Sequence, residues 1–136
     1  MHRLYLDTSI VIRALKPGKK GSRIARRFIE KCCSKHACIY TTVHLVELPR
    51  GSSALEFLEE KAVYREIDLK WVRRAASMII DAKGLSPSRE LDLMHLIAAK
   101  TLECQGILAR DRFLRRYAKK MGLTYVNWET HSGECP

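Results

Sequence analysis

The pattern of apolar and polar residues predicts short buried strands that alternate with amphipathic helices. Short apolar runs recur along the chain, and apolar residues at three- and four-residue spacing follow most of them. The predicted strands cover residues 3–6, 37–41, 62–67, 107–109 and 124–126. The predicted helices cover residues 10–15, 19–36, 42–48, 53–58, 69–83, 88–104 and 112–120. This alternation favours the α/β class, with a mostly parallel central sheet covered by helices on both faces.

The length and hydrophobic content fit one domain. A chain of 136 residues, of which 46% are hydrophobic, can bury a single core. We expect one domain over residues 1–136, with a loose polar tail at residues 128–136. The sequence has no run of about 18 apolar residues that could span a membrane. The N-terminus also lacks the apolar run of a signal peptide, so we expect a cytoplasmic protein.

The cysteines predict neither a disulfide framework nor a zinc site. There are five of them, in a chain without a signal-peptide pattern and without CxxC spacing. Cys104 and Cys135 stand alone in the sequence. A bridge from Cys38 to Cys32 or Cys33 stays open in the case that the source is a hyperthermophile.

The formal net charge of +10 indicates a polyanionic partner, with nucleic acid favoured over a membrane surface. Most of the positive charge lies in two segments, residues 19–35 and 110–120. We expect RNA to contact arginines of these segments, namely Arg23, Arg26, Arg27, Arg110 and Arg112. The alternatives are a plain solvated face for the first segment and an ion pair between Arg110 and Asp111 in the second.

Two acidic residues come shortly after predicted strands. Asp7 follows the first strand and Asp111 follows the strand at residues 107–109. Because the carboxyl ends of parallel strands meet at one edge of a sheet, where ligands gather in α/β folds, these acids are expected to lie close together. The alternative for each is a helix N-cap without further function.

Two further acids, Glu47 and Asp92, lie in the early parts of predicted helices and can face the same edge. Asp92 sits in a helix whose residues are largely apolar, so a route to solvent is hard to find for its side chain. The alternatives are an ordinary helix glutamate for Glu47 and a favourable interaction with the helix dipole for Asp92. His95, one turn after Asp92, is expected to be a packed, hydrogen-bonded histidine rather than a ligand.

Four converging carboxylates would repel one another and raise each other's pKa unless a cation were present. Ligand sets made only of oxygen favour Mg²⁺ or Mn²⁺ over zinc. Asp7, Glu47, Asp92 and Asp111 are therefore the candidate metal ligands and catalytic residues. A basic protein with such a cluster could hold a phosphate backbone while the metal ions promote hydrolysis.

These segments resemble PIN-domain ribonucleases and, in size, the VapC-type toxins of toxin–antitoxin pairs. The matching motifs are Leu6-Asp7-Thr8-Ser9, Val46-Glu47-Leu48, the Asp-Leu-Met-His-Leu-Ile-Ala-Ala of residues 92–99, and the Ile-Leu-Ala-Arg-Asp-Arg-Phe of residues 107–113 followed by Gly122-Leu123. They occur in the family's order over almost the whole chain. Two departures are Ala109, where many relatives have Thr or Ser, and Pro49, which follows Glu47 closely.

The resemblance implies a PIN-like, Rossmann-like α/β/α sandwich that is often a homodimer. It carries over Asp7, Glu47, Asp92 and Asp111 as the acidic metal cluster. It also implies that Thr8 or Ser9 supplies a hydroxyl that orients Asp7 or holds water at the metal.

The expected function is a Mg²⁺- or Mn²⁺-dependent endoribonuclease, the toxin of a pair with an antitoxin partner. The resemblance implies products with a 5′-phosphate and a 3′-hydroxyl. The alternatives are a non-catalytic RNA-binding subunit with the same fold and an RNA-processing PIN nuclease without an antitoxin. A phosphotransferase is disfavoured because Thr8 and Ser9, rather than a second acid, follow Asp7. A nucleotide-binding Rossmann protein is disfavoured because no G-x-G-x-x-G follows the first strand.

Overall fold

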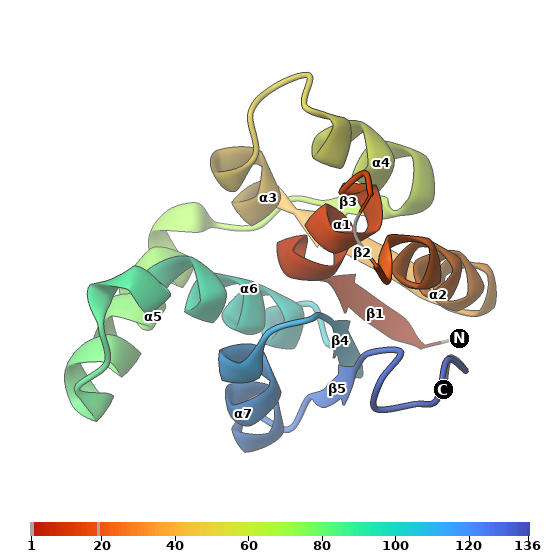
Figure 1. The fold of residues 1–136 in the computed structure, drawn as a ribbon. Coiled ribbons are helices and arrows are strands. Elements are labelled where there is room, and N and C mark those ends of the chain that lie inside the picture. Colours follow the sequence, from red (N-terminus) through yellow and green to blue (C-terminus); the bar gives the residue numbers. More distant parts are fainter. Residues whose placement is uncertain (1, 19) are drawn as a thin grey trace.

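The computed structural model describes residues 2–18 and 20–136, in which five parallel strands form one sheet (Figure 1). The strands are β1 (Arg3–Leu6), β2 (Ala37–Thr41), β3 (Val63–Arg65), β4 (Gly106–Leu108) and β5 (Thr124–Val126). Their order across the sheet is β3-β2-β1-β4-β5, and every pairing between neighbours is parallel. The predicted parallel sheet is thus confirmed, with β1 at its centre.

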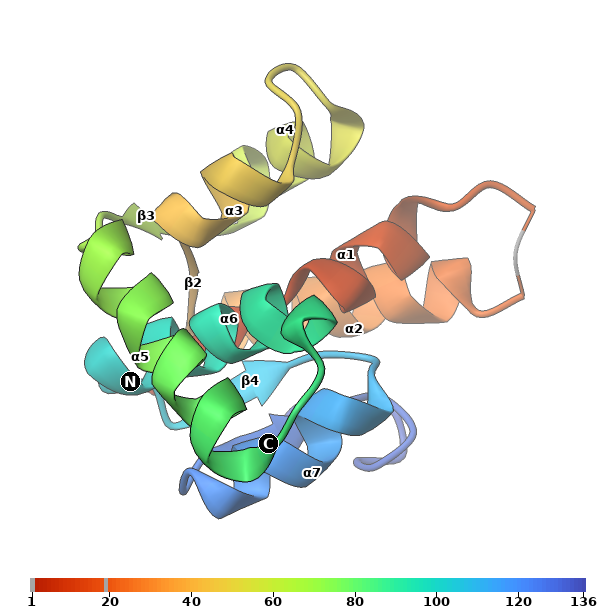
Figure 2. The same ribbon diagram turned by 90° about the vertical axis from the view of Figure 1, so that its left-hand side faces the viewer.

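Helices cover both faces of the sheet. On one face lie α1 (Thr8–Leu15), α2 (Ser22–Lys35) and α4 (Ser53–Lys61). On the other lie α5 (Leu69–Lys83), the short 3-10 helix η1 (Pro87–Arg89), α6 (Glu90–Thr101) and α7 (Arg112–Lys120). The short helix α3 (Thr42–Glu47) continues directly from β2, and α6 packs against α3, α5 and α7 (Figure 2). The α/β/α sandwich expected from the sequence is confirmed.

The central strand β1 contributes to a separate core on each face. Leu4 and Leu6 point into the core shared with α1, α2 and α4, whereas Tyr5 points into the core shared with α5, α6 and α7. All three side chains are buried, as expected for a parallel strand covered on both faces. The tyrosine thereby brings a polar hydroxyl into an otherwise apolar layer.

Several helix boundaries differ from the predictions. The helix expected over residues 88–104 is divided into η1 and α6 and ends at Thr101. Helix α2 begins at Ser22 because Gly21, with φ of 94°, turns the chain into the helix; the predicted start at Lys19 lies outside the described residues. Ile24 is 52% exposed, whereas its neighbour Ala25 is buried. Helix α4 is capped by Ser52, whose hydroxyl accepts the N–H of Leu55.

The C-terminal segment, for which we expected a loose tail, contacts α2. Trp128 and Cys135 pack against the core on that side, and Cys135 forms a disulfide with Cys32. A second disulfide joins Cys33 to Cys38, which is one of the bridges left open by the sequence. The side chain of Lys31 donates to the carbonyl of Gly133 at 3.3 Å. Within the described residues, no helix is long and apolar enough to cross a membrane.

Candidate functional site

Asp7 and Asp111 lie at the carboxyl-terminal edge of the sheet, just beyond β1 and β4. These strands are parallel neighbours, and the N–H of Asp7 donates to the carbonyl of Leu108 at 2.8 Å. Asp7 caps α1 by accepting the N–H of Ser9 at 3.0 Å, and Asp111 caps α7 by accepting the N–H of Leu114 at 3.0 Å. Each of these hydrogen bonds engages one of the two carboxylate oxygens, so helix capping is compatible with a second role.

Asp92 lies in the first turn of α6, where the charges of Asp7 and Asp111 affect its pKa. Burial and the negative charges of Asp111 and Asp7 raise the pKa of Asp92 to about 6, and Arg89, whose Nη1 is 3.5 Å from Oδ2, opposes this only in part. The pKa of Asp7 is also raised, chiefly by burial, with Glu47 adding to the effect and His95 opposing it. The raised pKa values mean that burial and nearby negative charge outweigh the positive charge around these two carboxyl groups.

Glu47 is the last residue of α3, not an early one, which corrects the sequence-based placement. The helix has only six residues because the chain leaves it at Leu48, immediately before Pro49. A carboxylate is unfavourable at the C-terminal end of the helix dipole. Two donors offset this: the Thr8 hydroxyl at 2.5 Å and His95 Nε2 at 2.7 Å, both to Oε1. Burial acts to raise the pKa of Glu47, but these partners outweigh it and lower the pKa overall.

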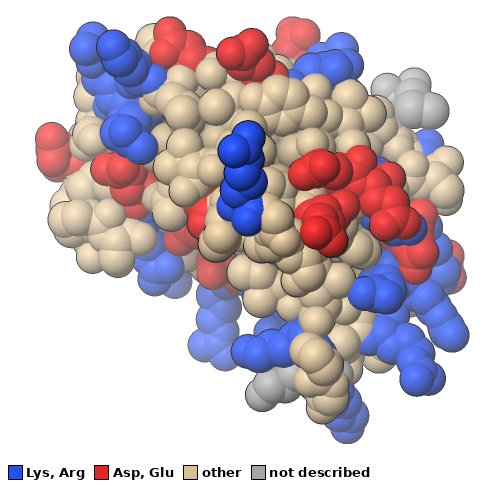
Figure 3. Space-filling model, turned by 90° about the horizontal axis from the view of Figure 1, so that it is seen from above, with Lys and Arg blue, Asp and Glu red and all other residues tan. Residues whose placement is uncertain are grey.

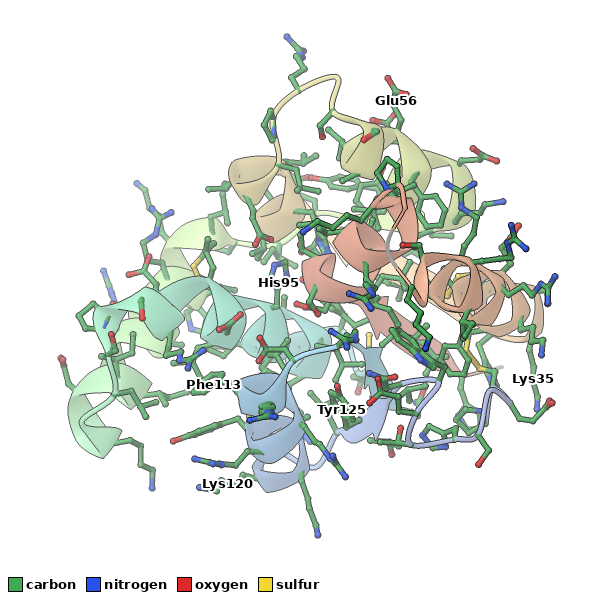
Figure 4. The ribbon with its side chains drawn as sticks, in the orientation of Figure 1. Lys35, Glu56, His95, Phe113, Lys120 and Tyr125 are labelled. Carbon is green, nitrogen blue, oxygen red and sulfur yellow. A yellow bond between two sulfur atoms is a disulfide. The ribbon has the colours of Figure 1, made fainter. Side chains whose placement is uncertain are left out.

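His95 is packed and hydrogen-bonded, as predicted, and only 1% exposed. It points from α6 toward α1 and α3 (Figure 4), where Nε2 donates to Glu47 and Nδ1 shares a 2.6 Å hydrogen bond with the Tyr5 hydroxyl. Burial acts to lower the pKa of His95, but the hydrogen bond with Glu47 and the charge of Asp7 outweigh it and raise the pKa. The acids around His95 therefore favour its protonated form.

Three buried polar residues that sequence reasoning missed extend this chain of contacts. The Tyr5 hydroxyl also shares a 3.0 Å hydrogen bond with the Thr41 hydroxyl. The ring of His44 accepts the N–H of Thr41 at Nδ1 and donates from Nε2 to the carbonyl of Leu6 at 2.6 Å. Burial, together with the charge of His95, lowers the pKa of His44 to about 3, so this imidazole is neutral. The available signal was the capping-box spacing of Thr41 and His44.

The two hydroxyl residues Thr8 and Ser9 contact different acids. The Thr8 hydroxyl donates to Glu47. Ser9 contacts Asp7 through its backbone N–H and its side chain, both of which lower the pKa of Asp7, and its hydroxyl also accepts the N–H of Arg110 at 2.9 Å. Ser9 therefore links the start of α1 to the segment that leads from β4 to Asp111.

Asn127 and Tyr125 position the segment between β4 and α7. The side-chain amide of Asn127, which is 3% exposed, donates to the carbonyl of Ala109 at 2.9 Å and to the Tyr125 hydroxyl at 3.2 Å. The Tyr125 oxygen in turn accepts the N–H of Asp111 at 3.2 Å (Figure 4). The backbone around Asp111 is thus held by Tyr125 of β5 and by Asn127, which directly follows β5; sequence reasoning singled out neither residue.

The donor chemistry of the four acids fits a hard divalent cation, because all ligands would be carboxylate oxygens and two of the pKa values are raised. Their side chains are not arranged as a finished metal site. Within residues 2–18 and 20–136, no three His, Cys, Asp or Glu side chains form a group that could hold a metal ion. The charges of Asp7 and Asp111 thus act on Asp92, and His95 holds Glu47 nearby. In the described residues, however, these side chains are not close enough together to coordinate one metal ion.

The arginines expected to bind RNA fall into two regions. Arg110 and Arg112 flank Asp111, and the Arg110 guanidinium lies 3.7 Å from Glu129 and over the Trp128 ring, so its observed ion pair is not with Asp111. With Arg115 they line a pocket of about 140 Å³ beside the acid. The remaining three lie on α2, which covers the other face of the sheet: Arg23, Arg26 and Arg27.

The surface charge also separates the two regions. Helix α4 carries Glu56, Glu59 and Glu60, and acidic side chains gather on the face seen in Figure 3. A phosphate backbone would be repelled there. Beside Asp111, the exposed residues of α7 are instead basic and include Arg112, Arg115 and Arg116.

Comparisons with known proteins agree on the fold. The family model described as PIN domain matches residues 4–120. A comparison with curated protein sequences gave no match. A similar solved structure is a chain in the crystal structure of VapBC2 from Rickettsia felis bound to a DNA fragment from their promoter. It has 14% sequence identity and a TM-score of 0.65, and the match covers 93% of the present chain and 98% of that chain.

Proposed function

The chain belongs to the PIN domain family, and from that premise we propose that it is a divalent-metal-dependent endoribonuclease. PIN domains are generally nucleases that use divalent metal ions. The observation that carries the proposal is that burial and the charges of Asp111 and Asp7 raise the pKa of Asp92, although the three acids come from separate segments. A buried acid beside other carboxylates destabilises the empty site when it is charged, and a bound cation would relieve that cost.

Asp7, Glu47, Asp92 and Asp111 would hold Mg²⁺ or Mn²⁺. The bound ion supplies water activation at neutral pH and neutralises charge on the phosphate. The chain's own contribution is to aim the carboxylates. Asp7 and Asp111 are each fixed by one backbone N–H, which leaves an oxygen for the ion. Glu47 is fixed by Thr8 and His95, and both of these bonds engage Oε1, which leaves Oε2.

The basic residues beside the acids would hold the RNA. Arg110 and Arg112 flank Asp111 at the start of α7, where they can contact the phosphates next to the scissile bond. Arg23, Arg26 and Arg27 of α2 are proposed as a second, more distant contact with the backbone. The net charge of +10 supports a polyanionic substrate.

We test the nuclease by incubating a generic RNA with manganese and, in parallel, with a chelator. Asp7→Asn, Asp92→Asn and Asp111→Asn keep the shape of each side chain and remove its charge, so each should abolish metal-dependent cleavage while the fold survives. Glu90→Gln is the matched control, because Glu90 shares the first turn of α6 with Asp92 but pairs with Arg73 at 3.4 Å.

Two results would overturn parts of the assignment. If Asp92→Asn cuts normally while Glu90→Gln is inactive, the choice of the third acid is wrong. If all the Asn variants match the parent in activity and metal response, the acids are only caps and surface charges. A non-catalytic RNA-binding subunit is the alternative in that case, and it is favoured by the absence of a finished metal-binding group in the part of the chain that the structure describes.

We also propose that the protein acts as the toxin of a toxin–antitoxin pair, in the cytoplasm and as a homodimer. The fold similarity to a chain of the VapBC2 complex supports an antitoxin partner. Expression of the protein alone should slow growth, and Asp7→Asn should relieve it. Equal toxicity of the two forms would exclude this role, and no toxicity in either would favour an RNA-processing nuclease.

A further inference from the structure

Helix α7 carries a pair of stacked aromatic rings close to the proposed site. Phe113 and Tyr117 lie one helical turn apart, with ring centroids 4.5 Å apart and planes inclined by 26°. Phe113 is only two residues from Asp111, and both rings are half-buried. The core contacts of α7 are made mainly by Leu114 and Ala118, which are fully buried. Phe113 and Tyr117 also pack against the edge of this core, but each ring stays only half-buried and so keeps part of its surface exposed.

Cations lie over both rings. The Arg89 guanidinium lies 4.5 Å from the centroid of Phe113, and Lys120 Nζ lies 4.7 Å from the centroid of Tyr117. Phe113 and Lys120 both lie along the left-hand side of α7 in Figure 4. Arg89 also reaches Asp92, with 3.5 Å between Nη1 and Oδ2. One side chain thus connects the aromatic pair to an acid of the proposed site.

A surface that combines aromatic faces with cations is suited to single-stranded nucleic acid. Every nucleobase offers a π-face for stacking, and nearby Lys or Arg holds the backbone. In a duplex, the faces of the bases are already stacked, so only unpaired bases can use such a surface. The cations over the rings, Arg89 and Lys120, would attract a negatively charged ligand such as a nucleic acid and repel a metal ion.

We propose that Phe113 and Tyr117 form a platform on which an unpaired base of the RNA substrate stacks beside the scissile phosphate. This assignment deepens the nuclease function proposed above and rests on it for the position of the phosphate. The base takes the place of the Arg89 guanidinium on Phe113. Arg89, whose side chain is 43% exposed and whose contact with Asp92 is long, then turns to the phosphate backbone. The substrate class is single-stranded RNA or an RNA loop.

The experiment measures RNA binding in the Asp7→Asn background, so that cleavage does not interfere. The probe is a labelled RNA of about 12 nucleotides, within the range of single-strand binding sites, either free or annealed to its complement. Phe113→Leu should weaken binding of the single strand by roughly 5- to 150-fold, the range for loss of one base–aromatic stack. Binding of the duplex should change by less than about two-fold, because it depends on phosphate contacts.

Three further variants separate stacking from folding. Phe113→Trp keeps an aromatic face and should bind the single strand as tightly as the parent, with tryptophan emission that the single strand quenches and the duplex does not. This signal reports on the platform even if Phe113→Leu fails to fold, as judged by its thermal melt. Tyr117→Leu should also weaken single-strand binding. Trp71→Leu removes an aromatic that is 55% exposed on α5 and should leave binding unchanged.

The results test the stacking platform and the nuclease activity as two separate proposals. If folded Phe113→Leu binds the single strand as tightly as the parent, or loses single strand and duplex equally, the platform is wrong whether or not the protein cleaves RNA. If binding follows the expected pattern but the protein with Asp7 intact cuts no RNA in manganese, the platform stands and the nuclease fails. If neither the parent nor any variant binds RNA, both proposals fail.

Discussion

At the scale of single residues, the charged carboxylate of Asp92 lowers the stability of the folded protein. Its folded-state pKa of about 6 lies above the ordinary value of 3.8. The folded protein therefore binds this proton more tightly than the unfolded chain does. As pH rises from about 4 to 6, the unfolded state gains relative to the folded state, and above pH 6 the full cost of the charged carboxylate remains.

We expect Asp92→Asn to raise the free energy of unfolding of the metal-free protein by about 1–2 kcal/mol at pH 7, after allowance for solvent screening at this partly exposed group. The gain should shrink toward zero near pH 4. Urea unfolding in chelator at a series of pH values measures it, with Glu90→Gln as the control from the same helical turn. A gain that is equal at pH 4 and pH 7 would contradict the electrostatic origin.

Tyr5 tests the buried hydrogen-bond chain. Tyr5→Phe keeps the ring in the core but leaves His95 Nδ1 without a partner, whereas the Thr41 hydroxyl keeps its hydrogen bond from the N–H of Val43. We expect a loss of stability of about 1–3 kcal/mol, because buried polar groups without a partner carry a desolvation penalty. Tyr64→Phe is the control, since its hydroxyl bonds to Thr42 at the exposed edge of the sheet. Denaturant unfolding compares them, and equal losses would show that burial of the network is unimportant.

At the scale of elements, α7 and α2 are both basic but stand in different relation to the acids. Asp111 is the N-cap of α7, whereas α2 packs against α1 on the opposite face of the sheet. The phosphate groups nearest the scissile bond should therefore meet α7. The sequence alone assigns the two helices equivalent roles, because each shows the same basic, amphipathic pattern.

We expect charge reversal on α7 to weaken RNA binding more than charge reversal on α2. Each triple variant replaces three exposed arginines by Glu. The α7 variant changes Arg112, Arg115 and Arg116, and the α2 variant changes Arg23, Arg26 and Arg27. The α7 variant should also flatten the dependence of log K on log salt by about 2, given a slope of about 0.7 per contact with a single strand. Binding measured from low to high salt checks this. A larger effect of the α2 variant would place the RNA path on the other face.

At the scale of the whole molecule, the two disulfides differ in the length of chain they close. Cys32 and Cys135 are 103 positions apart, whereas Cys33 and Cys38 are five apart. In the chain-entropy account, a longer loop gives more stabilisation. Cys135→Ser should therefore lower the free energy of unfolding by about 2–4 kcal/mol, and Cys33→Ser by less. Thermal melts with and without reductant, beside non-reducing peptide mapping, measure this; an effect of Cys33→Ser as large as that of Cys135→Ser would contradict it.

The sequence by itself determined the architecture and the location of two of the acids. Alternation of apolar runs with helical spacing reports which element forms and which face is buried, because both are local properties of the chain. Once the sheet is parallel, residues after its strands must meet at one edge, which places Asp7 and Asp111 together without further information. The packed state of His95 also followed from the apolar character of its helix.

Only the tertiary structure decided which side chains touch. Glu47 lies at the end of α3 and is held by Thr8 and His95, which are 39 and 48 positions away. Tyr5 reaches His95 across 90 positions, and Arg89 covers Phe113 from a different helix. Such contacts depend on strand register, on the length of short helices and on how helices pack. Periodicity carries none of this, because a pattern states that a residue is buried without stating what it faces.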